Sequence, residues 1–310
     1  MQTRYFIKKL AILVGSLYLI VTMTFVLMKV IPGDPFMQEQ AIPQEIIESL
    51  HRHYGLDQPL LTQYGRYLKG IVTCDLGPSF KYEGRTVGEI IYEGFPVSCC
   101  LGLEAIFLAF SGGVLLGSIA AAKRGKYPDQ LAMLIAVIGI SVPNFILASF
   151  LQYIFAMKLN LLPVARWGSF AQTILPAIAL AAIPMAFVAR LTRTNMVEVL
   201  EQDYILTARS KGLSMFQVIR RHVFRNSILP VITYLGPLSA NVLTGSFVIE
   251  KIFGIPGLGN WFVLSITNRD YTVIIGITIF YSALLLIAVF IVDILSAILD
   301  TRIQYRDKTA

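Results

Sequence analysis

Six long apolar stretches constrain the fold of this 310-residue chain more than any other feature. A helix needs roughly 20 mainly apolar residues to cross about 30 Å of hydrocarbon, and each stretch is close to that length or longer. Because 55% of the residues are apolar and only 15% are charged, the composition is also that of a membrane protein. We therefore predict an all-α polytopic membrane protein with six transmembrane helices. The stretches are residues 10–31, 98–122, 131–157, 171–189, 230–249 and 273–299.

Two of these stretches contain features that argue against a simple span. The fourth contains Pro176 and Pro184, but proline is tolerated in a membrane helix when the freed carbonyl groups find other partners. The first follows Arg4, Lys8 and Lys9, as the apolar part of a signal peptide would. It is too long for a signal peptide and five more apolar stretches follow, so we expect a retained signal anchor.

The positions of lysine and arginine predict the orientation, because these residues are enriched in cytoplasmic segments. Most of them lie in the N-terminal tail, the connection 123–126, the segment 190–225 and the C-terminal tail. Both termini are therefore expected in the cytoplasm. Insertion orientation and anionic lipid account for the net charge of +7, so no nucleic-acid partner is expected.

The order of these segments predicts three parts: a tail with the first helix (1–31), an extracytoplasmic cap (32–97) and a five-helix core (98–310). The cap is too long for a simple connection and mixes turn signals with short amphipathic runs, so we expect a small folded unit with little core of its own. Cys74 falls in the cap, and Cys99 and Cys100 fall at the outer end of the second stretch. A disulfide from Cys74 to either is conceivable, but unpaired apolar cysteines are the default.

A search for chemistry is mostly negative. The sequence has no phosphate-binding loop of the G-x-x-x-x-G-K-[ST] type, so we expect no ATP site on this chain. His51 and His53 share one amphipathic run without a third metal ligand, and a solvated pair is the simpler interpretation. No nucleophile, acid-base pair or cofactor motif is found, so we expect neither an enzyme nor a bound cofactor or metal. Gly113 and Gly117 have the spacing that allows close helix packing.

Residues 203–230, DYILTARSKGLSMFQVIRRHVFRNSILP, form a basic segment between apolar stretches. Ile205, Leu206 and Ala208 predict a short helix that ends at Gly212, where glycine can adopt the positive φ of a helix C-terminus. This segment lies in a region that the charge distribution places in the cytoplasm.

A second short helix is predicted to begin at Ser214, which stands three residues before Gln217 in a capping-box pattern. Phe216, Ile219 and Val223 then form an apolar stripe with arginines on either side. A basic amphipathic hairpin can rest on anionic lipid, or it can fit a groove on a partner protein. Physical reasoning alone leaves both interpretations open.

The same hairpin carries a recognisable pattern: Asp203-Tyr204, then Thr207-Ala208-Arg209-Ser210-Lys211-Gly212, Arg221-His222, Arg225-Asn226 and Leu229-Pro230. This pattern resembles the EAA coupling loop of ABC importer permeases, in the form used by peptide transporters. Further motifs, in this order, resemble the B-type permease subunit of oligopeptide and dipeptide importers. They are Ile31-Pro32-Gly33-Asp34-Pro35, Gly55-Leu56-Asp57, Asp75-Leu76-Gly77, Ser141-Val142-Pro143, Ile174-Leu175-Pro176 and Phe253-Gly254-Ile255-Pro256-Gly257-Leu258-Gly259.

The departures from the family pattern are small. Ser210 stands where the family usually has alanine, and Asp300-Thr301-Arg302-Ile303 lacks the usual proline. Glu104 has no counterpart that we identify in the family. None of these departures affects Gly212 or the basic residues around it.

The resemblance implies a type I ABC importer permease in a bacterial cytoplasmic (inner) membrane. It implies a heterodimer with a C-type permease subunit, two cytoplasmic ATPase subunits that hold ATP and Mg, and an extracytoplasmic peptide-binding protein. The implied function is passage of oligopeptides by alternating access. Dipeptides, glutathione or a metal chelate are alternative cargoes. An ion-coupled secondary transporter is a further alternative, although no inverted repeat is apparent.

The resemblance assigns roles to residues within the coupling loop 190–229, and the character of other residues suggests further sites. Residues implied in ATPase coupling are Tyr204, Thr207, Ala208, Arg209, Lys211, Gly212, Phe216, Arg221, His222 and Asn226. Residues expected to dock the binding protein are Phe253, Pro256, Gly257, Leu258 and Gly259. The small and polar Ser239, Asn241, Thr244 and Ser246 are expected to form a weakly binding wall of the translocation path.

Two carboxylates within apolar stretches need partners, because an ionisable group in the membrane usually faces a cavity or another polar group. We expect Glu104 to be satisfied by a neighbouring helix or the outer interface rather than to face the cargo. For Asp293 we expect a structural role, with Arg190 or Arg193 as its partner.

Overall fold

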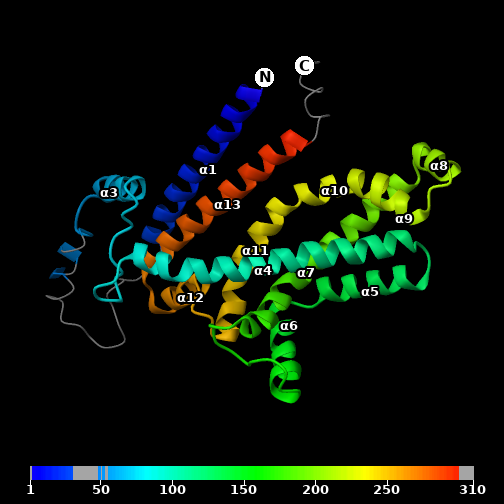
Figure 1. Cartoon of the computed structure of the whole chain (residues 1–310). Coiled ribbons are helices and arrows are strands. Elements are labelled where there is room, and N and C mark those ends of the chain that lie inside the picture. The colour runs from blue at the N-terminus through cyan, green and yellow to red at the C-terminus, as the bar shows by residue number, and fades with distance from the viewer. Residues whose placement is uncertain (1, 31–47, 50, 53–54, 300–310) are drawn as a thin grey trace. The chain divides into compact units, whose positions relative to one another are not determined.

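The described part of the chain is almost entirely helical in a computed structural model (Figure 1). The structure describes residues 2–30, 48–49, 51–52 and 55–299, and at 2–5, 237, 240–241, 243–245 and 295–299 it describes the backbone alone. Within these ranges the only β pairing is an isolated antiparallel bridge between Pro78 and Thr86. The motifs at 31–35 and 300–303 and the residue His53 lie outside the described residues.

The chain divides into two compact units, residues 1–97 with 256–286 and residues 98–255 with 287–310. The sequence-based boundary between cap and core also falls at residue 97, but residues 256–286 join the first unit rather than the second. The first unit holds α1 (Gln2–Val30), α3 (Leu60–Val72), α12 (Leu258–Asn268) and parts of α4 (Val87–Ala122) and α13 (Tyr271–Leu299). The second unit holds the rest of α4 and α13 and the helices α5 to α11.

Among the described residues, four helices are long and apolar enough to cross a membrane: Phe6–Val30, Val87–Ala122, Phe170–Leu200 and Tyr271–Ile294. They correspond to the first, second, fourth and sixth predicted stretches. The second helix begins at Val87 and not at residue 98, because a capping box precedes the apolar run. Thr86 N–H donates to Glu89 Oε2 at 3.0 Å, and Glu89 N–H donates to Thr86 Oγ1 at 3.2 Å.

The third predicted stretch is wrong as a continuous helix. It is divided into α5 (Tyr127–Ser141) and α6 (Asn144–Leu151), and the π-helical segment η1 (Gln152–Lys158) continues α6. The chain bends by 106° between α5 and this second part. The cause is Pro143, because proline disfavours helical geometry at the residue before it, and Val142 is extended with φ −94° and ψ 120°.

The fifth predicted stretch is divided between α10 (Phe224–Thr233) and α11 (Leu235–Phe253), with Tyr234 between them. α11 ends at Gly254, which adopts the left-handed conformation with φ +60°. The short helix α12 that follows is absent from the sequence-based prediction. If each bent helix pair counts as one span, the described residues contain up to six candidate spans.

The second unit is built around α7 (Phe170–Leu200), which contacts α5, α6, α10 and α11. Gly113 and Gly117 of α4 also approach α7 closely, as their spacing predicts. A Cβ atom at Gly113 would lie 2.7 Å from the carbonyl oxygen of Met185, and one at Gly117 would overlap the carbonyl oxygen of Ala189. Glycine is therefore required at both positions for this helix packing.

The first unit is held together by α3 and by one buried carboxylate. Tyr67, Leu68 and Ile71 of α3 pack on a cluster from α1 and α13, formed by Val21, Ile275 and Ile279. Asp270, which is fully buried before α13, accepts hydrogen bonds from the Ser79 hydroxyl, the Phe80 N–H at 3.3 Å and the Thr272 hydroxyl at 2.9 Å. This carboxylate joins the segment before α4 to the start of α13.

Candidate functional site

The basic segment after α7 forms a helical hairpin at one end of the second unit (Figure 1). We call residues 203–230 the basic hairpin. Its elements are α8 (Asp203–Ser210), α9 (Met215–Val218), the π-helical segment η2 (Ile219–Val223) and the first residues of α10.

The turn between α8 and α9 has the geometry predicted for Gly212. This residue has φ +85°, in the left-handed region that glycine adopts without strain. Gly212 N–H donates to the Arg209 carbonyl at 2.9 Å, and Leu213 N–H donates to the Ala208 carbonyl at 3.4 Å. These two bonds form a Schellman motif, which satisfies the last carbonyl groups of α8.

The second helix begins with the predicted capping box. Ser214 N–H donates to Gln217 Oε1 at 3.0 Å, and Gln217 N–H donates to Ser214 Oγ at 3.4 Å. With the glycine turn before it, this box fixes both ends of the connection between the two helices. The prediction of two short helices joined at Gly212 is confirmed.

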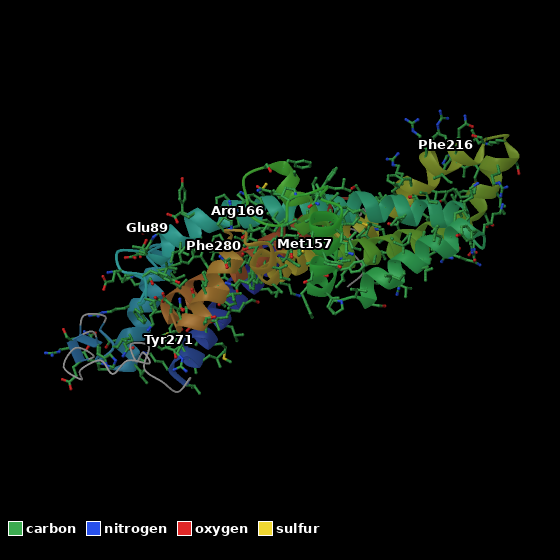
Figure 2. The ribbon with its side chains drawn as sticks, turned by 90° about the horizontal axis from the view of Figure 1, so that it is seen from below. Glu89, Met157, Arg166, Phe216, Tyr271 and Phe280 are labelled. Atoms are coloured by element: carbon green, nitrogen blue, oxygen red, sulfur yellow. The ribbon has the colours of Figure 1, made fainter. Side chains whose placement is uncertain are left out.

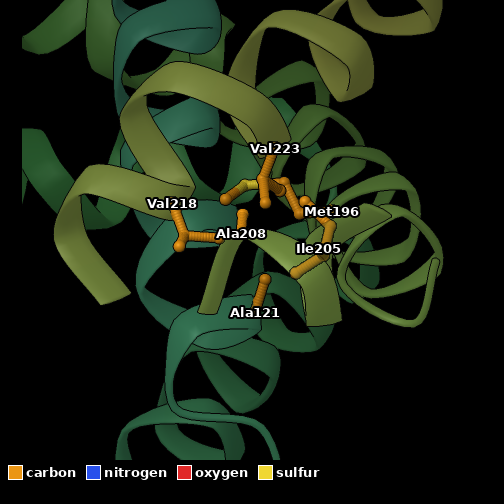
Figure 3. Packing of buried hydrophobic residues seen from close by; sticks show 6 residues of the cluster. All are labelled: Ala121, Met196, Ile205, Ala208, Val218 and Val223. Carbon is orange, nitrogen blue, oxygen red and sulfur yellow. The ribbon is translucent and has the colours of Figure 1, made fainter. Parts of the chain in front are cut away.

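A small apolar core lies beneath the hairpin (Figure 3). Val218 and Val223 of the second helix pack against Ile205 and Ala208 of α8. The same core includes the ends of the two long helices beneath, Ala121 of α4 and Met196 of α7. The hairpin is therefore packed onto these helix ends, which is the arrangement that a rigid lever requires.

The predicted apolar stripe Phe216, Ile219 and Val223 does not lie on one face. Phe216 is 73% exposed, as its expected contact with an ATPase requires, whereas Val218 and Val223 are buried. The reason is η2, because a π-helical turn brings residues five apart onto one face, and Val218 and Val223 have that spacing. A sequence pattern read with a period of 3.6 residues selects Phe216 in place of Val218.

The outer face of the hairpin combines apolar tips with positive charge. Phe216 lies on the outer surface of the hairpin, away from the rest of its unit (Figure 2). Of the residues expected to contact an ATPase, the structure leaves most exposed; His222 is half-buried, and Ala208 belongs to the core. The exposed ones are Tyr204, Thr207, Arg209, Lys211, Gly212, Phe216, Arg221 and Asn226.

A side-chain hydrogen bond joins the two helices of the hairpin on this outer face. The amide nitrogen of Asn226 donates to the hydroxyl of Tyr204 at 3.0 Å. The bond connects the start of α8 to α10, so two of the residues implied in coupling also stabilise the shape of the hairpin.

Two ion pairs fix the turn between α4 and α5 to α7, just before the hairpin. Asp129 receives a bidentate pair from Arg193, with Nε to Oδ1 at 2.6 Å and a second nitrogen to Oδ2 at 2.8 Å. Arg124 pairs with Glu201 at the end of α7. The guanidinium group of Arg193 therefore pairs with Asp129. The pairing of Asp293 with Arg190 or Arg193 stays a prediction. The sequence analysis missed Asp129 altogether.

The residues from Phe253 onward, which are expected to dock a binding protein, are mostly buried, unlike those of the basic hairpin. Phe253 is 1% exposed, Leu258 is fully buried, and Gly257 and Gly259 are also buried. Pro256 is exposed, as is Lys251 at the end of α11. Side chains buried within the chain itself cannot contact a docked protein, so only Pro256 among the five expected residues is available for direct contact.

The residues expected along the translocation path lie on α11. Ser239 is half-buried and donates to the Leu235 carbonyl at 2.7 Å, whereas Ser246 is buried. The side chains of Asn241 and Thr244 lie outside the described ones. Near the end of the same helix Glu250 is fully buried and accepts a hydrogen bond from Ser98 at 2.8 Å.

Glu104 is half-buried on α4 and accepts a hydrogen bond from the Cys100 thiol one turn earlier, at 3.8 Å. Cys74, Cys99 and Cys100 are free, so the structure contains no disulfide among them. In the described part of the chain no group of three or more His, Cys, Asp or Glu residues could hold a metal ion.

The chain matches two family profiles that together cover most of its length. Residues 113–305 match the family described as binding-protein-dependent transport system inner membrane component. Residues 2–102 match the N-terminal part described for the same kind of transport system membrane component.

Two curated relatives are similar along their whole length. The dipeptide transport system permease protein DppB of Bacillus subtilis (strain 168) is 52% identical over 307 residues, covering 99% of this chain and 100% of the relative. The oligopeptide transport system permease protein OppB of Escherichia coli (strain K12) is 40% identical over 304 residues, covering 97% of this chain and 99% of the relative.

Among solved structures, an inward-facing MetNI methionine ABC transporter is similar with a TM-score of 0.58 at 15% identity, covering 68% of this chain and 96% of that chain. An amino acid ABC transporter with histidines is similar with a TM-score of 0.53 at 18% identity, covering 67% of this chain and 94% of that chain. At these identities the likeness supports the fold, which is that of type I ABC importer permeases.

Proposed function

Because the chain belongs to the family of binding-protein-dependent transport system inner membrane components, we propose that it is the B-type permease subunit of an ATP-driven peptide importer. It encloses the path together with a C-type permease subunit. ATP and Mg are bound by two separate ATPase subunits, and this chain performs no catalysis of its own.

The observation that carries this proposal is the division of the basic hairpin into a buried and an exposed face. The buried face packs on Ala121 of α4 and Met196 of α7, so a force on the hairpin is transmitted to two long helices. The exposed face offers Phe216 as an apolar tip on a hairpin whose arginines and lysine are also exposed. This is the chemistry of a helix that inserts into an apolar groove with an acidic rim.

The hairpin acts as a lever in the transport cycle. Closure of the ATPase dimer pushes the exposed face, and the rigid packing beneath it rocks the membrane helices between inward-open and outward-open states. The Asp129–Arg193 pair keeps α5 and α7 together during this movement, because breaking it leaves a buried carboxylate uncompensated. Gly212 maintains the angle between α8 and α9.

The hairpin and both termini lie in the cytoplasm in this proposal, and the cap faces outward. The distribution of positive charge supports this orientation. The binding protein docks on the outer side, where Pro256 and Lys251 are exposed near the buried Phe253 and Leu258. We assign the buried residues a supporting role beneath that surface.

Peptides are the proposed cargo, and the names of the two relatives support this class. Oligopeptides are the principal expectation. Dipeptides are the second candidate, because the relative with 52% identity is named a dipeptide permease. Cargo contacts are assigned to α11, through Ser239, Asn241 and Thr244. Ser246, which is buried, is assigned a supporting role behind them.

Purification of the chain in detergent tests the assembly, because co-purifying ATPase subunits are expected. Uptake of labelled peptides of increasing length into a deletion strain, with and without the gene restored, tests the cargo. ATP-dependent uptake that requires the chain supports the proposal. Proton-driven uptake by this chain alone would overturn it.

A further inference from the structure

A cavity of about 280 Å³ lies within the first unit, between the end of α1, the amphipathic helix α3 and the start of α13. Its floor is apolar and comes from the membrane helices, with Phe25 and Met28 from α1 and Ile275 from α13. Tyr271, labelled in Figure 2 at the start of α13, also lines it. Phe25, Met28 and Lys29 belong to the last two turns of the apolar span Phe6–Val30, so the cavity lies at the end of this candidate membrane helix.

Two cations line the same cavity, Lys29 at the end of α1 and Arg66 of α3. Lys29 Nζ donates to Gln63 Oε1 at 2.5 Å and lies 5.9 Å from the centre of the Phe25 ring. Neither cation has a carboxylate partner among the described residues. Two cations that line one cavity repel each other, so an anion between them is stabilised by both.

A third polar group points to a ligand independently of these charges. The hydroxyl of Tyr67, which also lines the cavity, is buried without a hydrogen-bond partner among the described residues. Buried hydroxyl groups are nearly always hydrogen-bonded, and an unpaired one costs about 1 to 3 kcal/mol. Burial raises the pKa of the Tyr67 phenol, so it remains protonated and can donate to an acceptor.

We propose that this cavity binds the phosphodiester headgroup of an anionic phospholipid, held by Lys29, Arg66 and Tyr67. Each of the three groups is a donor, and a phosphate oxygen is an acceptor for all of them. The two cations favour a headgroup with a net negative charge over a zwitterionic one, whose own ammonium group they repel.

The surroundings favour a lipid over a soluble anion. On α1, Val26, Leu27 and Val30 near the cavity are exposed and provide a surface for acyl chains. On α3, Leu61 and Val72 are each 84% exposed, as is common in a helix that lies at a membrane interface. A free phosphate ion or a peptide carboxylate would use the cations but not these apolar surfaces.

The test uses the assembled transporter in detergent and measures its thermal unfolding midpoint as lipid is added. Phosphatidylglycerol is expected to raise the midpoint of the unmodified complex more than phosphatidylcholine does. In the double variant Lys29→Gln/Arg66→Gln, the apparent affinity for phosphatidylglycerol is expected to fall by about tenfold or more, because two charge-assisted contacts are lost. Tyr67→Phe, which keeps the ring and its packing, is expected to weaken binding by a few-fold.

The matched control is Arg52→Gln/Lys69→Gln, which removes two cations from the same unit without changing the cavity lining. Its affinity for phosphatidylglycerol should equal that of the unmodified complex. Equal stabilisation by both lipids, or equal loss in both double variants, would overturn the proposal. If millimolar inorganic phosphate without lipid raises the unfolding midpoint as much as phosphatidylglycerol does, the cavity binds a free anion and the lipid proposal is wrong. Competition between transported peptide and phosphatidylglycerol would assign it to a cargo carboxylate.

Discussion

The basic hairpin and the turn after α11 were both expected to contact partner proteins, yet they present their expected contact residues in opposite ways. The hairpin exposes Phe216 and most of its basic residues. The turn buries Phe253 and Leu258 and exposes Pro256. A residue can belong to a recognisable motif because it packs inside its own chain, so a motif alone does not identify a contact surface.

The difference arises from how each region packs against the rest of its own unit. The hairpin packs on the rest of the second unit through apolar residues on one side, which leaves the other side exposed. At the turn, Gly94 of α4 approaches the backbone of Leu258, where a Cβ atom would lie 2.9 Å from the Leu258 nitrogen. This close backbone approach encloses Gly257 and Leu258.

Matched phenylalanine substitutions give the largest expected contrast between the regions. Phe253→Ala removes a fully buried ring, so we expect a loss of roughly 3 to 5 kcal/mol in stability and a low yield of assembled complex. Phe216→Ala should leave the unfolding midpoint nearly unchanged and strongly reduce uptake. Thermal unfolding and uptake measured on the same preparations check both. Similar midpoints for the two variants would remove the contrast.

Removing the Asp129–Arg193 ion pair tests how firmly the helices that carry the hairpin are held together. Arg193→Gln leaves the buried carboxylate of Asp129 without its counter-ion, and we expect a loss of about 3 kcal/mol. The double variant Arg193→Gln/Asp129→Asn should recover much of that stability, because no charge remains buried. A double variant as unstable as the sum of the two single ones would show that the pair does not couple α5 to α7.

Substitution of Gly212 in the hairpin turn is expected to have an intermediate effect on stability. Gly212→Val places a branched side chain at φ +85°, which costs about 1 to 2 kcal/mol and is expected to abolish uptake while membrane insertion continues. Gly84→Val is the control, because Gly84 also has a positive φ of +72° and open space around it, in the first unit. Normal uptake by well-expressed Gly212→Val would contradict the role of the turn.

The smallest effect is expected from the hydrogen bond on the outer face. Tyr204→Phe removes the acceptor for Asn226, and for an exposed bond of this kind we expect a loss of about 1 kcal/mol or less. Uptake should fall moderately, since the shape of the exposed face is less well fixed. A double-mutant cycle with Asn226→Ala separates this bond from other contacts of the two side chains. A coupling energy of zero would mean that the bond does not shape the hairpin.

Much of this architecture could be predicted from the sequence, because it depends on local signals. The apolar runs indicate the long helices, Gly212 indicates the end of α8, and the Ser214 and Gln217 pair indicates the start of α9. The bend at Pro143 and the capping box at Thr86 and Glu89 were also visible in the sequence but were outweighed by the length of the apolar runs.

The remaining features depend on contacts between distant segments. Phe253 is buried, and its carbonyl accepts from the N–H of Arg166, which is far away in the chain, at 2.8 Å. No local sequence pattern reports such a contact. The partnership of Asp129 with Arg193 joins residues on two different helices. Val218 is buried and Phe216 is exposed because of the π-helical segment η2. Sequence patterns for helices assume the α-helical period of 3.6 residues, so they do not detect this arrangement.

Site-specific photo-crosslinking within the hairpin tests the central claim most directly. A photoreactive residue at the exposed position 216 is expected to capture an ATPase subunit in the assembled transporter, with a yield that changes when ATP is added. The same residue at position 218, which is fully buried two residues away, should capture none. Capture from both positions, or capture of only lipid from position 216, would contradict the assignment of this face to the ATPase.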